Sequence, residues 1–137
     1  MADTVKVIDR SSAEFYVLSK VNGRTVDDSL TATRRASYGQ GFLMTTKVVG
    51  RDIPAEPSRF LIVGRNDYAA PIQALSNKIY QVKGETSFTP VANGSYVVKG
   101  TLGPTYSAVW IEDASTGAVV GPKIEKEGSA ELGFFEK

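Results

Sequence analysis

The chain contains no cysteine and no histidine among its 137 residues. The absence of cysteine excludes disulfides, thiolate metal sites and a cysteine nucleophile. The absence of histidine excludes histidine metal ligands, the Ser-His-Asp and Cys-His catalytic arrangements, and the usual general base near neutral pH. We therefore expect no catalytic residue, no cofactor and no metal site, and the first hypothesis is a non-enzymatic function.

Long hydrophobic runs are also missing, because no stretch approaches the roughly 20 apolar residues of a membrane helix. The first ten residues, MADTVKVIDR, lack the basic and apolar regions of a signal peptide. The net charge of +1 is too balanced to predict binding to nucleic acid or to a membrane surface. The arginines, however, all lie in the first half of the chain, at positions 10, 24, 34, 35, 51, 59 and 65.

Helical periodicity is nearly absent, and short runs of Val, Ile, Thr, Phe and Tyr alternate with Gly, Pro, Asn or Asp. This spacing predicts an all-β, antiparallel sandwich of roughly nine to eleven strands in one domain, residues 1–137. A closed barrel is the open alternative. We expect at most one short helix near 71–78, where Pro71 suits the first helical position. The predicted strands are 4–8, 13–21, 24–27, 30–36, 42–49, 59–64, 78–89, 95–102, 106–113, 118–126 and 129–135.

Two turns can be read from local chemistry. Asn22-Gly23 predicts a tight hairpin turn, because both residues tolerate positive φ. The adjacent acids Glu112 and Asp113 should point to opposite faces of a strand, so they cannot form a catalytic carboxylate pair. Asp113 is then expected to cap a bend that Gly117 closes. A second acidic pair, Asp27-Asp28, is interpreted as a loop or a cap of the next element rather than a calcium site.

Residues 82–102 predict a hairpin in which PVANG (90–94) forms the loop and Phe88 faces Tyr96. In this register Val82, Thr86 and Phe88 share a buried face with their partners. On the opposite face Glu85 should meet Lys99.

The segment SYGQGFLMTT (37–46) and the arginines before it give a candidate binding surface. Its glycines permit close approach of a ligand or a second chain, and Tyr and Arg are favoured contact residues. The alternative interpretation is a strand interrupted by a bulge or bend. The candidate binding residues are Arg34, Arg35 and Tyr38.

The C-terminal half, FTPVANGSYVVKGTL followed by AVWIEDASTGAVV, resembles small immunoglobulin-like sandwiches in bacterial envelope lipoproteins of unassigned function. YVLSKVNGRTV (16–26) is similar to a hairpin that occurs early in such domains. The resemblance implies an immunoglobulin-like fold and a periplasmic or outer-membrane-associated location, with the cytoplasm as the alternative. It provides no catalytic residue. Because the lipid-bearing cysteine is missing, a lipid anchor would require a precursor segment. The matching positions are Phe88, Pro90, Gly94, Tyr96, Val98, Gly100, Val109, Ile111, Asp113, Thr116, Gly117 and Val120.

These observations predict a non-enzymatic module of a bacterial envelope or secreted protein that binds another macromolecule, a protein or a glycan, or supports assembly. No nucleic-acid partner and no transmembrane segment are expected. Three alternatives stay open. An enzyme that works with carboxylates alone needs several acids converging in one pocket. A carbohydrate-binding module needs exposed aromatic residues on one surface, and a small β-barrel for an apolar ligand needs an interior cavity. The candidate aromatic residues for a carbohydrate-binding module are Trp110, Tyr38, Tyr68 and Tyr106.

Overall fold

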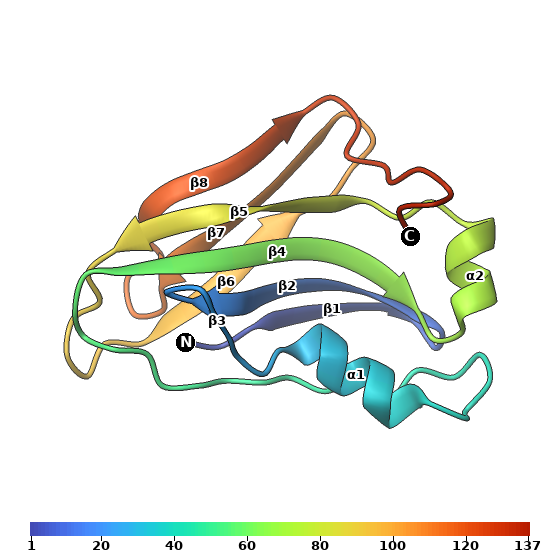
Figure 1. Ribbon diagram of the computed structural model, residues 1–137, viewed down its shortest axis with the longest axis horizontal. Helices are drawn as coiled ribbons and strands as arrows, with labels where there is room; N and C mark the ends of the chain where they lie inside the picture. The colour runs from blue at the N-terminus through green and yellow to red at the C-terminus, as the bar shows by residue number, and fades with distance from the viewer.

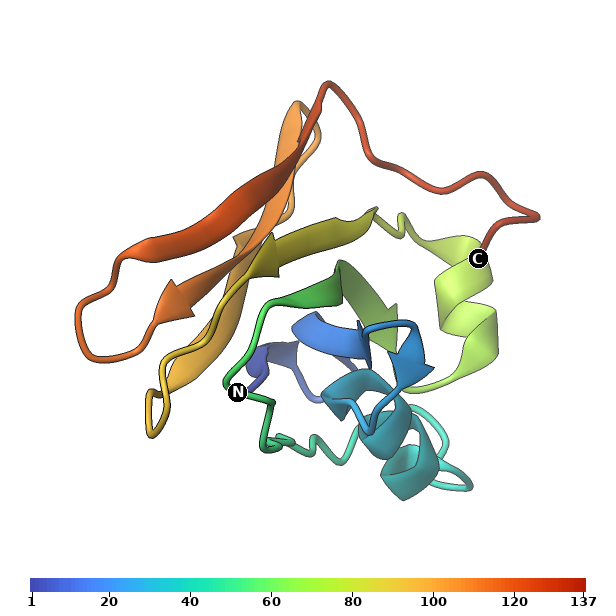
Figure 2. The same ribbon diagram turned by 60° about the vertical axis from the view of Figure 1, so that its left-hand side comes forward.

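Alternating apolar residues build two antiparallel sheets that face each other (Figures 1 and 2). The structure is a computed structural model that describes residues 1–137. One sheet has the strand order β1-β2-β4-β5, with β3 paired to β2, and the other has the order β6-β7-β8. The strands are β1 (Thr4–Asp9), β2 (Ser12–Val21), β3 (Arg24–Thr25), β4 (Ser58–Tyr68), β5 (Gln81–Phe88), β6 (Tyr96–Thr101), β7 (Tyr106–Asp113) and β8 (Val119–Glu127).

The fold is mostly antiparallel β in two sheets, which confirms the coarse prediction, and it has eight strands rather than nine to eleven. Two short helices are present rather than one, α1 (Ser29–Ser37) and α2 (Pro71–Ser76). The predicted strand 129–135 is wrong, because this segment only forms a single bridge between Tyr80 and Glu131. Neither helix has the length and apolarity needed to cross a bilayer.

The core lies between the two sheets and takes every second side chain from each. Aromatic rings join the layers, with centroids 5.0 Å apart for Phe60 and Phe88 and 5.1 Å apart for Phe88 and Tyr96. Removing this apolar surface from water is the main stabilising contribution to the fold. The buried core residues are Tyr16, Leu18, Phe60, Ile62, Val82, Tyr96, Val98, Val109 and Ile111.

Strand β2 is buried on both of its faces. Its alternate residues Ala13, Phe15 and Val17 form a second small core on the outer side of the sheet. Leu30 of α1 and Met44 pack against this cluster. The molecule therefore has a third layer over β2, made of α1 and the chain that follows it (Figure 2).

The predicted strand at 30–36 is wrong, since these residues belong to α1. Ser29, Thr33 and Ser37 are spaced four residues apart and therefore lie on one buried helical face. Their hydroxyl oxygens accept hydrogen bonds from backbone N–H groups of an extended segment. Ser29 accepts from Val49 at 2.8 Å, Thr33 from Lys47 at 2.9 Å, and Ser37 from Thr45 at 2.9 Å.

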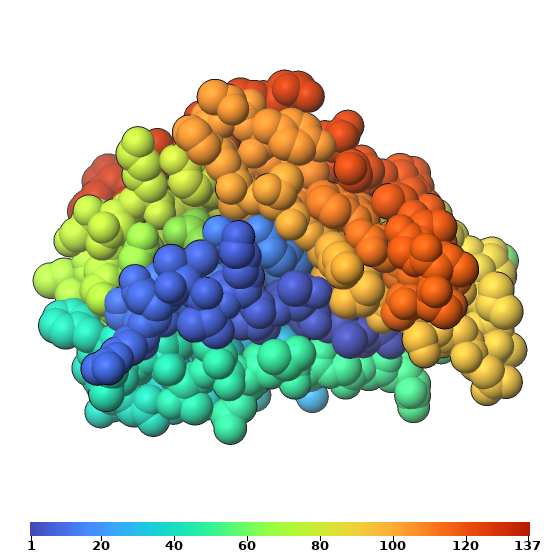
Figure 3. Space-filling model, turned by 180° about the vertical axis from the view of Figure 1, so that it is seen from behind, coloured from blue at the N-terminus to red at the C-terminus, as the bar shows by residue number.

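We call the extended segment 44–50 the strap. It replaces the predicted strand at 42–49, because its backbone N–H groups bond to the hydroxyls of α1 instead of to a neighbouring strand. At its two ends it reaches β1, where Met44 N–H donates to Arg10 O and Val49 O accepts from Asp3 N–H. Figure 3 shows the strap from behind, running along the blue N-terminal strand.

The predicted β5–β6 hairpin is also wrong. Strand β5 pairs with β4, and β6 pairs with β7, so the loop 89–95 crosses from one sheet to the other. The predicted buried face is correct, because Val82, Thr86 and Tyr96 are all buried, but they meet across the core rather than along a ladder. Glu85 and Lys99 therefore do not pair with each other. Glu85 lies 3.9 Å from Arg59, and Lys99 lies 3.4 Å from Glu112.

The predictions made from turn chemistry are confirmed. Asn22 and Gly23 join β2 to β3 with φ of 50° and 83°. Pro71 is the first residue of α2. Asp113 accepts hydrogen bonds from Ser115 N–H at 2.9 Å and Ser115 O–H at 2.6 Å, which lower the pKa of the Asp113 carboxyl. Gly117 then closes the bend with φ of 75°.

Asp28 is the N-cap of α1, as one of the two interpretations of Asp27-Asp28 predicted. Its carboxylate accepts the backbone N–H of Thr31 at 2.8 Å. Asp28→Ala should therefore lower the free energy of unfolding by about 1 kcal/mol, measured by urea denaturation. Asp27→Ala is the matched control and should change it by less than about 0.5 kcal/mol, since the Asp27 side chain caps nothing. Equal losses in the two variants would contradict the capping role.

Candidate pocket between the two helices

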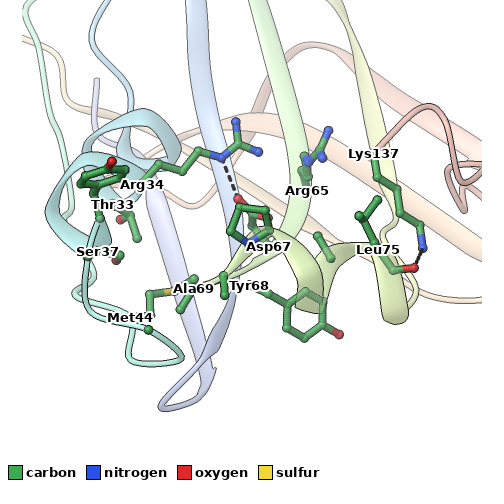
Figure 4. A pocket seen from close by; sticks show the side chains of 16 residues that line it. Thr33, Arg34, Ser37, Met44, Arg65, Asp67, Tyr68, Ala69, Leu75 and Lys137 are labelled. Atoms are coloured by element: carbon green, nitrogen blue, oxygen red, sulfur yellow. Dashed lines mark hydrogen bonds and ion pairs between the residues drawn. The ribbon is translucent and has the colours of Figure 1, made fainter.

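A pocket of about 650 Å³ lies where α1, the end of β4 and α2 meet (Figure 4). It is outside the two-sheet core, on the face of the β1-β2-β4-β5 sheet that α1 covers. This volume lies within the range of small-ligand sites. The lining residues are Thr33, Arg34, Ser37, Tyr38, Gly39, Gly41, Met44, Arg65, Asp67, Tyr68, Ala69, Ala70, Pro71, Ala74, Leu75 and Lys137.

The alternation of β4 explains how charged residues reach this pocket. Ile62 faces the core, so the odd-numbered residues that follow, Val63, Arg65 and Asp67, face the α1 side of the sheet. Val63 completes the small core over β2. Arg65 and Asp67 extend beyond it, where α1 ends and the pocket begins.

Arg34 of α1 and Asp67 of β4 form an ion pair across the pocket. Arg34 Nε donates to Asp67 Oδ2 at 2.7 Å, and the two side chains are 53% and 7% exposed. Only the Arg34 side of the ion pair is therefore accessible to water. The terminal nitrogens of the Arg34 guanidinium remain available to a ligand.

Arg65 lies close to this pair and is half-buried. Its Nη1 donates to Gln81 Oε1 at 2.9 Å, while its buried Nε has no hydrogen-bond partner. Burial lowers the pKa of Arg65, and the nearby charge of Arg34 lowers it further, whereas Asp67 acts in the opposite direction. Asp67 thus pairs with Arg34 and lies near a second guanidinium that no carboxylate contacts, so the site carries uncompensated positive charge.

The walls around these charges are mostly small or apolar. Ala70, Pro71, Ala74 and Leu75 come from α2 and the residue that precedes it, and Met44 comes from the start of the strap. Lys137 closes one side, with its ammonium donating to Asn77 O at 2.5 Å. The pocket therefore combines an apolar floor with a cationic end, which is the arrangement that an amphipathic anion needs.

The loop after α1 forms the entrance. Tyr38 is 90% exposed at its start. Gly39 and Gly41 follow with φ of 78° and 64°, values that disfavour any residue with a Cβ. The segment 37–46 is therefore a loop and not the interrupted strand of the alternative interpretation. Phe42 and Leu43, next in the chain, are also exposed, as are Ile72 and Leu75 on α2.

The structure brings together only part of the predicted binding surface. Arg34 and Tyr38 line the pocket, whereas Arg35 is exposed on α1 and does not. The sequence interpretation missed Arg65 and Asp67, and it missed the contribution of α2. One signal was present: Arg65 and Asp67 continue the alternation of Val63 beyond the predicted strand 59–64, just before the predicted helix near 71–78.

The four aromatic residues named for a carbohydrate site divide between two surfaces. Tyr38 and Tyr68 line the pocket. Tyr106 and Trp110 lie on β7, where they alternate with the buried Val109 and Ile111 and so face away from the core. The Trp110 ring is already covered by the ammonium of Lys123, 4.2 Å from its centroid.

No three carboxylates lie close enough together to hold a metal ion. Neither protein-family models, nor curated proteins, nor solved structures gave a match to this chain. Functional inference therefore depends on the pocket itself.

Proposed function

We propose that the chain is a non-enzymatic binding module whose two sheets support a ligand pocket between α1, β4 and α2. The observation that carries this proposal is that two guanidinium groups, Arg34 and Arg65, line one pocket near a single carboxylate and beside apolar walls. The hydroxyls of Thr33 and Ser37 already bond to the strap, so they are held in structural roles. Binding, rather than bond breaking, is what this residue set supports.

The partner we propose is another macromolecule, one of whose segments enters the pocket. Exposed apolar residues next to the entrance, Phe42 and Leu43 on one side and Ile72 on the other, support a contact larger than the pocket alone. Aromatic residues and arginine are also the side chains that contribute most to binding between proteins. Tyr38 and Arg34 provide both at the entrance.

The resemblance of the C-terminal half to immunoglobulin-like envelope domains motivates the proposed setting, a bacterial envelope or secreted protein with an immunoglobulin-like sandwich. A glycan-binding module remains the second candidate, with Tyr38 and Tyr68 as its stacking residues. The barrel alternative needs a cavity between the sheets, whereas that space holds nine packed side chains.

A pull-down from an extract of the source organism tests the proposal. We expect Arg65→Glu to lose a partner that the unchanged protein retains, because the substitution reverses the charge at the pocket's cationic end. Arg35→Glu is the matched control, since it makes the same charge change on an exposed residue outside the pocket. Arg34→Ala, at a largely exposed position, provides a second variant if Arg65→Glu fails to fold. Identical partners for all four proteins would contradict the proposal.

A further inference from the structure

The charges in the pocket indicate what kind of group it binds. Arg65 uses one N–H on Gln81, and its Nε, although buried, has no partner within the chain. Leaving a charged donor unpaired in a poorly hydrated position is unfavourable, and two neighbouring guanidinium groups add repulsion. An anion between Arg34 and Arg65 would remove this repulsion.

The number of charges favours a monoanion. Asp67 compensates one guanidinium, and the Lys137 ammonium already donates to the carbonyl oxygens of Leu75 and Asn77 at the end of α2. Next to the two guanidinium groups this leaves one positive charge (2 − 1), and the Lys137 ammonium adds another charge where it meets those carbonyl oxygens. A carboxylate fits the charge at the guanidinium groups, and its two oxygens match the planar fork of a guanidinium. A dianionic phosphate would be left with excess negative charge beside Asp67.

The apolar walls define what the carboxylate should be attached to. Met44 and Leu75 lie on opposite sides of the pocket (Figure 4), and Ala70 and Ala74 also line it. None of these four side chains offers a hydrogen bond. A body of methylene or methyl groups would exclude water from these surfaces.

We propose that this pocket binds a carboxylate carried on a short apolar body, with the carboxylate between Arg34 and Arg65 and the apolar body against α2. This inference rests on the proposed function, which it makes specific. The same chemistry is presented by a free aliphatic acid and by the C-terminal residue of a polypeptide that ends in an apolar side chain.

Calorimetric titration of the whole chain with three probes tests the inference: hexanoate, hexanamide and hexyl phosphate. Hexanoate should bind about tenfold more tightly than hexanamide, because only the acid gains charged hydrogen bonds. Arg65→Gln should weaken hexanoate about tenfold and leave hexanamide unchanged, while Arg35→Gln should match the unchanged protein. N-acetyl-leucine and its amide, titrated in the same way, distinguish a polypeptide end from a free fatty acid.

Equal binding of acid and amide, tighter binding of hexyl phosphate, or no binding of any probe would overturn the carboxylate assignment. Retention of a partner by the unchanged protein and by Arg35→Glu, but not by Arg65→Glu, would still support the proposed binding function after such a result. The two proposals therefore fail separately. Circular dichroism melting of Arg65→Gln confirms that a lost signal reflects the site and not the fold.

Discussion

Asp3→Ala should lower the free energy of unfolding by about 3–5 kcal/mol, because it leaves a buried guanidinium without its partner. The Asp3 side chain is fully buried. Its two oxygens accept hydrogen bonds from the two terminal nitrogens of Arg51, at 2.6 and 2.9 Å. The same carboxylate accepts the backbone N–H groups of Leu18 and Ser29. One side chain therefore links β1, β2, α1 and the end of the strap.

Urea denaturation followed by tryptophan fluorescence measures this effect. Glu85→Ala is the control, because it removes a carboxylate from an exposed ion pair with Arg59 and should cost less than about 1 kcal/mol. A loss of the same size in both variants would show that the buried carboxylate does not organise the four segments.

Gly100→Ala should destabilise the protein by about 3 kcal/mol, at the upper end of the range for overpacking a core. A Cβ at position 100 would lie 2.5 Å from the backbone oxygen of Ala108 and would also overlap the ring of Tyr16. The ring also lies close to Gly64, its neighbour on the adjacent strand β4, since a Cβ there would be 3.2 Å from the same ring carbon. Tyr16 thus occupies a slot between two glycines from different sheets.

Thermal unfolding of Gly100→Ala beside Gly50→Ala checks this packing. At Gly50 the nearest atom to an added Cβ is 3.8 Å away, so the same substitution should be tolerated there. If the two variants unfold at the same temperature, the two sheets are not in contact through Tyr16.

The strands of this protein were predictable where one face alone is buried. Val109 and Ile111 alternate with Trp110 in the sequence, and the predicted strand 106–113 has the bounds of β7. Pairing was not predictable in the same way. Phe88 and Tyr96 are close in sequence and both apolar, which is equally consistent with a hairpin and with two strands that face each other across a core.

Helix α1 was missed for a different reason. Its residues SLTATRRAS contain Thr and Ser, which favour strands or turns when considered singly. Its stability comes from the Asp28 cap and from the hydroxyls of Ser29, Thr33 and Ser37, which bond to a strap that is distant in sequence. No local rule anticipates such a partner.

The candidate site was half predictable. Arg34 and Tyr38 were identified from the glycines that follow them, but Arg65 is 31 positions beyond Arg34 (65 − 34). It enters the pocket only because β4 lies beside β2, the strand that α1 covers. The arrangement that matters, two guanidinium groups near one carboxylate, is a property of the folded chain.

The most direct test of a ligand site between α1, β4 and α2 is a titration of the ¹⁵N-labelled protein with hexanoate, followed by amide chemical shifts. We predict concentration-dependent shifts confined to residues 33–44 and 65–75, which contain most of the pocket lining. Shifts that cluster instead on β6, β7 and β8, or none at saturating hexanoate, would contradict a carboxylate site at this place in the fold.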